Sequence, residues 1–394
     1  MIDSISIARS GLMGFGSALR AIANNTANLN TPGFKGSSTQ FANMFYGTNS
    51  LVGNGNSNFG QFGYGLNTLG TSINFQQGQL QSTGNPLDLA IDGQGFFVLR
   101  DTNGNIHYTQ DGQFKFDSSG TLVSVTTGEQ VMSLDSGGNL VPLSLNNLKT
   151  SAAQATSSIT FSGNLSSTAT SNSLGNLTVI DAAGTSHTLT LSFAPVAGTP
   201  GSWTATLSDG TTTVGTATLN FSNGRPTAAS AIMSMTYTPT GGTAIPLTLD
   251  FSNNVTSFDS GATSTLAVAS QNGFGPGTLT KATFDAVGTL VLTYSNGQTV
   301  KNRQLALGQF LSEDDVEAVG NNEFAAKNGV RWQIGSAGSG PFGAVRSGQV
   351  QLSNVDLSQE FSELVIMQRG YQACSQVIST SSDMLTALFG MIGK

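Results

Sequence analysis

Three short motifs in this chain contain residue types that could carry chemistry. Residues 338–343 read Gly-Ser-Gly-Pro-Phe-Gly and fit the G-x-G-x-x-G pattern of dinucleotide-binding loops. Residues 135–138 read Asp-Ser-Gly-Gly, a sequence found around nucleophilic serines. Residues 101–105 read Asp-Thr-Asn-Gly-Asn and begin like a calcium-binding EF-hand loop. Whether any of them binds a cofactor or a metal, or attacks a substrate, depends on the residues around it.

In each case the surrounding residues contradict the chemistry. Pro341 and a strand-like run follow the glycine motif, whereas a dinucleotide-binding loop must open a helix. Only His107 and His187 could act as a base for Ser136, and a hairpin turn explains that tetrapeptide better. Ile106 replaces the glycine that an EF-hand loop requires, and no glutamate closes the loop. We therefore predict no enzyme activity, no catalytic, cofactor-binding or metal-binding residues, and no cofactor.

Composition excludes further classes of protein. Among 394 residues there are 15 Lys+Arg and 22 Asp+Glu, a net charge of −7, and only 9% of residues are charged. Nucleic-acid binding is excluded because counterion release requires a basic patch. The single cysteine, Cys374, excludes a disulfide framework and a multi-cysteine metal site. We expect no membrane insertion and no cleaved secretory signal, since neither a long apolar run nor a basic start followed by an apolar stretch is present.

Both ends of the chain are predicted to be long helices. Near each end, apolar residues recur at steps of three, four or seven, which is the spacing of a coiled-coil seam. The first pattern stops at residues 30–33, Asn-Thr-Pro-Gly, and Asp356 is a candidate N-cap for the second. The predicted seam consists of Ile5, Leu12, Phe15, Leu19, Ile22 and Leu29 in the first helix, and Leu357, Phe361, Leu364, Tyr371, Ile378 and Leu385 in the second.

The sequence between the helices predicts strands. Alternating apolar residues and Asn-Gly, Asp-Gly and Ser-Gly turns mark a β domain that is split around an inserted, Ser/Thr-rich β domain. The predicted fold is therefore mixed and mainly β, with two β domains and a terminal coiled-coil pair. The expected boundaries are 1–71 and 355–394 for the helical domain with its Gly/Asn-rich connector at 47–70, 72–150 and 281–354 for the split β domain, and 151–280 for the insert.

Two such helices cannot easily be stable by themselves. Full burial of an apolar side chain contributes about 1.5–3 kcal/mol, whereas ordering the backbone costs roughly 1–2 kcal/mol per residue. Asp3, Arg9 and Arg20 are the only charged residues before Lys35, so the outer faces are weakly polar. The sequence therefore favours helices packed on several sides in a homopolymer, and the alternative is an intramolecular coiled coil on a monomer.

Several long motifs resemble one protein family. Residues 10–12 and 23–35 closely resemble the N-terminal signature of flagellar rod and hook proteins, and residues 353–361 and 367–373 resemble the C-terminal one. Residues 86–97 and 108–114 are similar to the β domain that the family shares. The resemblance implies a self-assembled tube with the helices innermost, the split β domain in the middle and the insert outermost. An insert of this size, which resembles the outer domain of hook subunits, favours a hook-type subunit; the alternative is a distal rod protein.

The resemblance also implies a role, partners and a location. A hook-type subunit would carry torque from rod to filament as a universal joint, and its partners would be copies of itself, rod, hook cap and hook–filament junction proteins, and the type III export apparatus. Its location would be extracellular, in the flagellum, after export without cleavage. Phe41, Met44 and Phe45 lie in a segment that resembles a short hydrophobic export signal, or they form a simple apolar cluster. A surface adhesin is the alternative from a different class, but it would predict a secretory signal.

Cys374 departs from the family pattern. The family usually has a small polar residue at this position, two residues after Gln372. Within a packed helix, a cysteine behaves as a small apolar side chain. We therefore expect Cys374 to be buried, and a crosslinking or redox role is the alternative.

Overall fold

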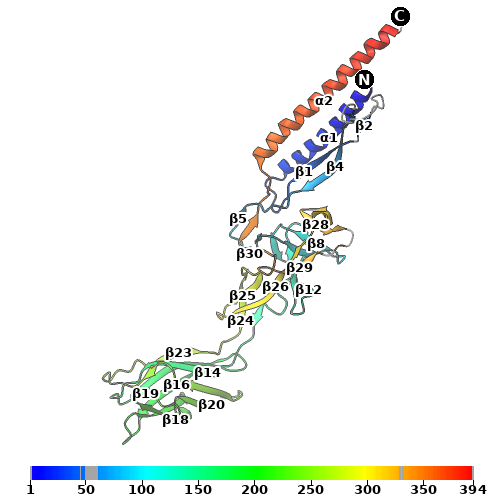
Figure 1. The fold of residues 1–394 in the computed structure, drawn as a ribbon. Coiled ribbons are helices and arrows are strands. Elements are labelled where there is room, and N and C mark those ends of the chain that lie inside the picture. The colour runs from blue at the N-terminus through cyan, green and yellow to red at the C-terminus, as the bar shows by residue number, and fades with distance from the viewer. Residues whose placement is uncertain (1, 45, 49–60, 328–329, 331, 393–394) are drawn as a thin grey trace. The chain divides into compact units, whose positions relative to one another are not determined.

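The computed structural model describes residues 2–44, 46–48, 61–327, 330 and 332–392. The described chain is mainly β with one long helix near each end (Figure 1), which confirms the predicted fold class. It divides into two compact units, the first comprising Met1–Asn146, Ala282–Val291 and Lys301–Lys394, and the second Asn147–Lys281 and Leu292–Val300. The predicted insert lies within the second unit, and the three-domain division stays a prediction.

The two terminal helices begin and end close to the predicted positions. Helix α1 spans Ile2–Ala27, and helix α2 spans Leu357–Ile392. Asp356 is the N-cap of α2, because its Oδ1 accepts hydrogen bonds from the backbone N–H groups of Ser358 (2.8 Å) and Gln359 (3.2 Å). The first helix stops before the Asn-Thr-Pro-Gly sequence, so Leu29 lies in the turn that follows α1 rather than in the helix.

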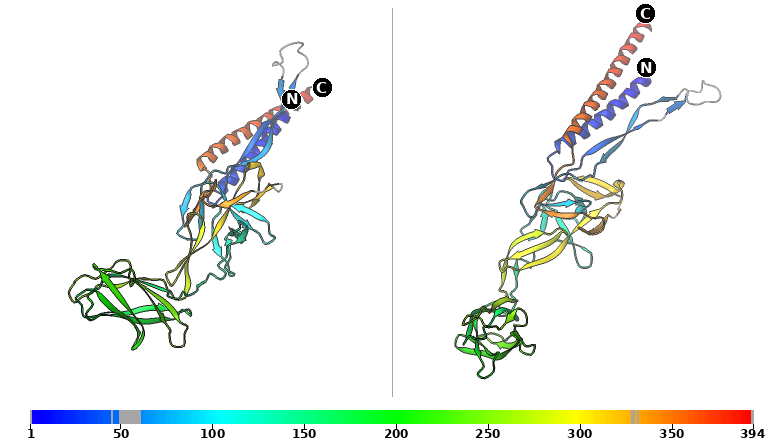
Figure 2. Two further views of the ribbon diagram at one scale, coloured as in Figure 1. Left: turned by 60° about the horizontal axis from the view of Figure 1, so that its bottom comes forward. Right: turned by 60° about the vertical axis from the view of Figure 1, so that its left-hand side comes forward.

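Helices α1 and α2 run side by side and antiparallel (Figures 1 and 2). Three pairs set the register: Gly11 with Cys374, Phe15 with Gly370, and Asn25 with Glu360. The Asn25 Nδ2 donates to Glu360 Oε1 at 2.8 Å, and a Cβ atom placed on Gly370 would lie 2.7 Å from Phe15 Cζ. This register sets the start of α1 opposite about residue 383, so the last two turns or so of α2 extend beyond α1.

Two β-hairpins follow α1 in the chain. Strand β1 (Ser37–Asn43) pairs with β4 (Leu66–Ile73), and β2 (Tyr46–Thr48) pairs with β3 (Gln61–Gly63). The β1–β4 hairpin packs on α1, where the backbone N–H of Leu66 donates to the Ser10 hydroxyl at 3.1 Å. Most of the described part of the predicted connector at 47–70 is therefore paired strand, since the hairpins satisfy its backbone groups.

The rest of the first unit is a β domain built on one large sheet. Within this unit the sheet has the order β26-β11-β7-β8-β28-β27. Its strands and those around it are β5 (Leu80–Ser82), β6 (Leu89–Asp92), β7 (Phe96–Arg100), β8 (Ile106–Thr109), β9 (Phe114–Phe116), β10 (Leu122–Ser124), β11 (Gln130–Leu134), β12 (Leu140–Pro142), β26 (Thr299–Gln309), β27 (Val316–Gly320), β28 (Glu323–Ala326), β29 (Gln333–Ser336), β30 (Ala344–Ser347) and β31 (Gln349–Gln351), with one 3₁₀ turn at Glu313–Asp315. Strands β13 (Thr150–Ser151), β24 (Gly277–Phe284) and β25 (Thr289–Tyr294) lie in the chain around the boundary of the units.

Aromatic rings fill the core of this domain. Tyr108 stacks on Trp332 with ring centroids 3.9 Å apart, and Phe96 meets Trp332 edge-on at 5.3 Å. Gly308 lies directly against Tyr108, since a Cβ atom there would be 2.5 Å from the tyrosine ring. The close stack therefore requires glycine at this position.

The second unit contains two sheets of five strands. One has the order β20-β21-β14-β22 with β23 paired to β14, and the other has the order β15-β16-β17-β18-β19. The strands are β14 (Ser158–Asn164), β15 (Asn172–Ile180), β16 (Ser186–Pro195), β17 (Ser202–Asp209), β18 (Thr212–Ser222), β19 (Arg225–Pro226), β20 (Ile232–Tyr237), β21 (Ile245–Asp250), β22 (Val255–Thr256) and β23 (Ala267–Gln271). Alternate residues of both sheets meet in one apolar core that includes Trp203, Phe161 and Phe251.

Candidate functional site

The outer surface of helix α2 is the largest run of exposed apolar side chains on a helix of the described chain. Along one side of α2, next to the α1-facing Gly370 and Cys374, lie Ile366, Val377, Met384 and Met391. At about 100° per residue these four positions fall within about 40° of one another, so they form one continuous stripe, here named the α2 outer stripe. Ile366 is 62% exposed and Met391 is 75% exposed. An apolar surface of this kind marks an interaction site.

The structure distributes the predicted seam residues between contact and exposure. Ile22 is buried and Phe15 packs over Gly370, while Ile5, Leu12, Leu19, Leu364, Ile378 and Leu385 are half-buried. Leu357, Phe361 and Tyr371 are exposed, with Phe361 at 52%. Leu29 is half-buried in the turn after α1. The single chain therefore covers only part of the predicted seam, and the assignment of these residues to a polymer interface remains a proposal.

Two close contacts between the helices, Gly11 with Cys374 and Gly370 with Phe15, were not predicted from the sequence. Cys374 lies against Gly11, where a Cβ atom would be 2.6 Å from its Sγ, and it is half-buried rather than fully buried. Glycines were not counted as seam positions because they add no apolar side chain. Glycines at seam-like positions of both helices are the signal that could have predicted these contacts, because a glycine on one helix allows a side chain of the other helix to approach closely.

The predicted export segment is described only in part. Phe41 lies in β1, where its ring centroid is 6.3 Å from that of Phe15 on α1. Met44 is half-buried, and Phe45 lies outside the described residues. The described part of the segment thus belongs to the apolar packing between the β1–β4 hairpin and α1.

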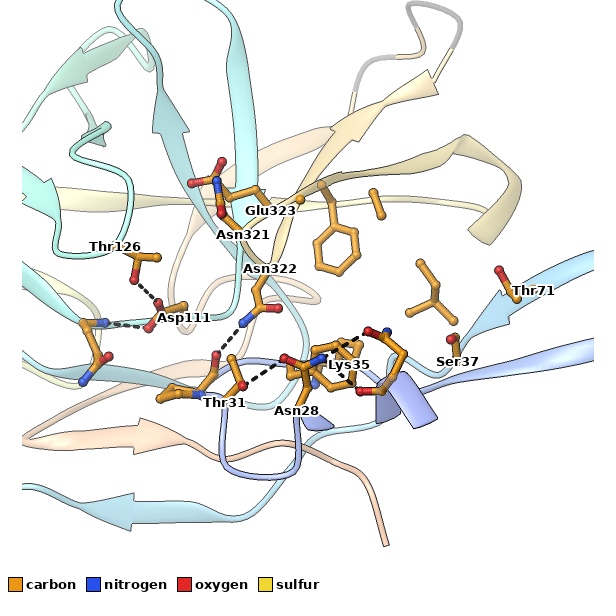
Figure 3. Close-up of a pocket in the computed structure, with 18 residues that line it drawn as sticks. Asn28, Thr31, Lys35, Ser37, Thr71, Asp111, Thr126, Asn321, Asn322 and Glu323 are labelled. Carbon is orange, nitrogen blue, oxygen red and sulfur yellow. Dashed lines mark hydrogen bonds between the residues drawn. The ribbon is translucent and has the colours of Figure 1, made fainter. Parts of the chain in front are cut away.

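A cavity of about 620 Å³, lined by both polar and apolar residues, lies where the chain leaves α1 and enters the β domain (Figure 3). We name it the junction cavity. Its walls come from the end of α1 and residues 31–37, from the end of β4, from residues 111–126, and from the β27–β28 turn. Asn322 Nδ2 donates to the Pro32 carbonyl at 3.0 Å, so the turn after α1 is held directly on the β domain. A side-chain hydrogen bond therefore joins the turn after α1 to the β domain at this cavity.

Gly33 allows this close approach. It has φ of 72°, and a Cβ atom placed on it would lie 2.5 Å from the backbone nitrogen of Asp111. Its N–H donates to the Gln351 carbonyl at 2.8 Å, next to the start of the C-terminal segment. Any side chain here would both strain the backbone and collide with the β domain.

Lys35 is buried beside the cavity. Its Nζ donates to the Gln76 carbonyl at 2.8 Å and to Gln351 Oε1 at 3.2 Å, and only 5% of the residue is exposed. Burial lowers the pKa of Lys35 to about 8, because a charged ammonium loses hydration there. Lys35 therefore joins the segment after α1 to the segments around Gln76 and Gln351. With a pKa of about 8, its ammonium group loses its proton at mildly alkaline pH.

Carboxylates form the opposite wall. Burial raises the pKa of Asp111, and the charge of Asp88 adds to this, although the N–H of Gln113 and the hydroxyl of Thr126 donate to the carboxylate. Burial also raises the pKa of Glu323, followed by the charges of nearby acidic groups. The sequence reasoning singled out none of these residues. The sequence signal that could have predicted these residues is the alternation of polar side chains at His107, Thr109 and Asp111, along β8 and directly after it.

All three chemistry-bearing motifs lie in turns, and a turn was predicted for residues 135–138. Asp101 Oδ1 accepts from the backbone N–H of Asn105 at 2.7 Å, and Asp135 Oδ1 accepts from that of Asn139 at 2.8 Å. The glycine motif at residues 338–343 leads into strand β30 and opens no helix. His107 bonds to Glu129, and His187 bonds to Asp181, so neither histidine is engaged with Ser136. Among the described residues, no helix is long and apolar enough to span a membrane.

Four family models match this chain in order. They are described as flagella basal body rod protein (residues 5–35), flagellar hook protein FlgE/F/G D1 domain (90–172), flagellar basal body protein FlaE D2 domain (163–274) and flagellar basal body rod FlgEFG protein C-terminal (346–391). Together they reach both terminal helices, the β domain and the second unit.

Full-length relatives carry the same assignment. The flagellar hook protein FlgE of Salmonella typhimurium is 32% identical, over 98% of this chain and 100% of that protein. FlgE of Escherichia coli is 31% identical and FlgE of Borreliella burgdorferi 28% identical, each over 98% of this chain. The crystal structure of Helicobacter pylori FlgE2 aligns with 68% of this chain and 99% of that chain at a TM-score of 0.49 and 14% identity. Sequence identity of 31–32% to the Salmonella and Escherichia coli proteins, over 98% of this chain and 100% of each relative, places the chain in the flagellar hook protein family.

Proposed function

We propose that this chain, a structural subunit of the flagellar hook, assembles into a helical tube by burying the α2 outer stripe and the exposed seam residues against neighbouring copies. The observation that carries the proposal is the exposure of apolar residues along α2. Each stripe residue is about half exposed or more, so its burial in an assembly would contribute on the order of 1 kcal/mol. Because the same surface repeats in every copy, these contributions accumulate along a polymer.

The part of α2 beyond α1 strengthens the argument. Phe389 is 68% exposed. It lies about eight turns after Glu360, on the side of α2 that contacts α1 nearer the start of the helix. It is exposed because the antiparallel register leaves no α1 residue opposite it. A helix from another copy can cover this end of α2, and α1 of the same chain cannot reach it.

The second unit suits an outer layer that bends. The predicted insert contains only five charged residues, Asp181, Asp209, Arg225, Asp250 and Asp259. Contacts between such surfaces would include few directional ion pairs, so copies could shift past one another at little energetic cost. Together with a stiff helical core, this supports a role as a universal joint that carries torque from rod to filament. We expect the subunit to act through assembly, without catalysis.

The partners follow from this role. Besides copies of itself, the subunit would contact rod, hook cap and hook–filament junction proteins, and it would leave the cell through the type III export apparatus without cleavage. Phe41, Met44 and Phe45 remain the candidate export signal. Its packing on α1 in the folded chain is compatible with export if the segment is recognised before folding.

A charge placed on the outer stripe tests the assembly surface. Ile366→Asp would put a carboxylate into the proposed interface while leaving the isolated chain folded, since Ile366 is 62% exposed. We expect purified Ile366→Asp protein to stay monomeric under conditions in which the unmodified chain forms tubes, as seen by sedimentation and electron microscopy. The matched control is Gln376→Asp, which adds the same charge to an exposed position of the same helix whose helical neighbours, such as Arg369, Gln372 and Thr380, are polar. Normal tubes from Ile366→Asp, or equal loss in both variants, would contradict the proposed surface.

Deletion of the gene tests the place in the flagellum. Basal bodies from cells that lack the gene should show complete rods that end without a hook, and the cells should be non-motile. Truncated rods would indicate the distal rod protein instead. Intact flagella would contradict both assignments.

A further inference from the structure

His107, Glu129 and Glu323, of which Glu323 also lines the junction cavity, form a compact set of metal-ligand types. His107 Nδ1 lies 2.9 Å from Glu129 Oε1 and 3.7 Å from Glu323 Oε2. Ligand atoms of all three residues lie within 4.8 Å of one another. We propose that His107, Glu129 and Glu323 bind a divalent transition-metal ion, for which Zn²⁺ is the probe.

The register of the sheet explains why the three side chains meet. His107 on β8 pairs with Leu99 on β7, which pairs in turn with Val131 on β11. Side chains opposite one another, and those two residues along a strand, share one face of a sheet. Glu129 precedes Val131 by two residues, and Glu323 on β28 pairs with Thr109, two residues after His107. Three segments far apart in the sequence thus present their polar side chains on the same face.

The distances fit a small tetrahedral ion. Zinc binds imidazole nitrogen and carboxylate oxygen at about 2.0–2.2 Å, which separates ligand atoms by roughly 3.3–3.6 Å in a tetrahedron. The observed 2.9 Å and 3.7 Å bracket this range, so movements of well under about 1 Å would complete the geometry. Binding through Nδ1 requires the neutral imidazole to carry its proton on the other ring nitrogen, Nε2, so the ion binds without removing a proton from the neutral ring.

Burial and charge favour an ion over an empty cluster. The Glu323 side chain is 6% exposed, and its distance of 3.7 Å from the imidazole exceeds hydrogen-bonding length. Asp111 adds a third carboxylate nearby. The lysine and arginine ion pairs of the described residues lie elsewhere, at Lys301–Asp285 and Arg346–Asp92. A divalent cation would neutralise the buried carboxylate of Glu323 and the half-buried carboxylate of Glu129 together.

The ion also has a route of entry, and it would stabilise the part of the β domain to which the segment after α1 is attached. Glu323 and Asp111 line the junction cavity, which is large enough to admit hydrated ions (Figure 3). Bound there, the ion would join β8, β28 and the turn before β11, next to Asn322, which holds Pro32. We therefore expect metal binding to stiffen the β domain where the terminal segment attaches. This inference does not rest on the proposed assembly surface.

Metal binding to the full-length monomer tests the site. All measurements use a Cys374→Ser background, so that the single thiol of the chain cannot bind zinc. Equilibrium dialysis against ZnCl₂ should give one Zn²⁺ per chain, and His107→Gln and Glu323→Gln should each weaken binding at least tenfold. The matched control is His187→Gln, because His187 pairs at 3.0 Å with a single carboxylate, that of Asp181. Absence of binding, or equal binding by His107→Gln, would overturn the proposal, as would loss of binding in His187→Gln.

A spectroscopic measurement separates a lost site from a lost fold. Trp332 lies in the first unit and Trp203 in the second, so single-tryptophan variants report on each unit. Zn²⁺ should raise the unfolding midpoint seen by Trp332 and leave that seen by Trp203 unchanged. His107→Gln should keep native Trp332 fluorescence while abolishing the shift. A shift confined to Trp203, or an equal shift with Mg²⁺, would overturn the site, because an imidazole ligand favours zinc over magnesium.

Discussion

Gly370 on α2 offers a sharp test of the helix pairing. A Cβ atom added there would lie 2.7 Å from Phe15 Cζ and 2.8–2.9 Å from the two Cε atoms. Carbon atoms prefer separations of about 3.5–4.0 Å, so the ring must move by nearly 1 Å. The ring of Phe41 lies on another side of Phe15, with centroids 6.3 Å apart, and restricts that movement. Overpacking of this kind costs about 1–3 kcal/mol.

Helix propensity opposes this cost. Alanine is favoured over glycine within a helix by about 1 kcal/mol, so we expect Gly370→Ala to destabilise the α1–α2 pair by a net of about 1 kcal/mol. Gly16→Ala on α1 is the matched control, because no atom lies within 4 Å of a Cβ placed there. That variant should stabilise the helix by about 0.5–1 kcal/mol.

Hydrogen exchange of the monomer, resolved by mass spectrometry, measures both effects. Protection factors of peptides from α1 and the first half of α2 should fall about fivefold in Gly370→Ala and rise in Gly16→Ala. Phe15→Leu, which shortens the colliding side chain, should restore protection in the Gly370→Ala background. If Gly370→Ala increases protection as much as Gly16→Ala does, Phe15 does not lie over Gly370 and the antiparallel register is wrong.

Three further predictions concern single residues. Stability of the first unit, followed by Trp332 fluorescence during urea unfolding, should rise between about pH 8 and 10.5, because unfolded Lys35 keeps a proton that the folded residue has lost; Lys35→Met should remove this rise. Gly33→Ala should lower the free energy of unfolding of the same unit in urea by more than about 1 kcal/mol, whereas Gly104→Ala, with open space around it, should lower it less. Trp203→Ala should destabilise the second unit by about 3–5 kcal/mol in calorimetry and leave the first unit's transition unchanged.

The helices could be predicted because their signals are local. Apolar spacing, Asp356 as a cap and the Asn-Thr-Pro-Gly stop depend on residues within a few turns of one another. Helix α2 begins directly after Asp356, and α1 ends two residues before Leu29, the last residue of its predicted seam. The β character of the middle of the chain was likewise visible from alternating apolar residues and from turn residues. The identity of the family followed from long motifs in a fixed order.

The candidate sites depended on contacts between distant segments. Cys374 and Gly370 acquire their roles only through the register of α1 against α2, which the seam spacing alone leaves open because several registers bury similar apolar surface. His107, Glu129 and Glu323 meet through the order β11-β7-β8-β28, which brings residues separated by more than two hundred positions onto one face.

The sequence by itself therefore determined the helical ends, the β character of the middle and membership of the hook family, since local propensity and motif order suffice for these. Only the tertiary structure decided which apolar residues of α2 remain uncovered, and that Lys35 and Glu323 are buried on opposite walls of one junction. The physical reason is that exposure and pKa depend on what packs against a side chain, and those partners come from parts of the chain that no local pattern connects.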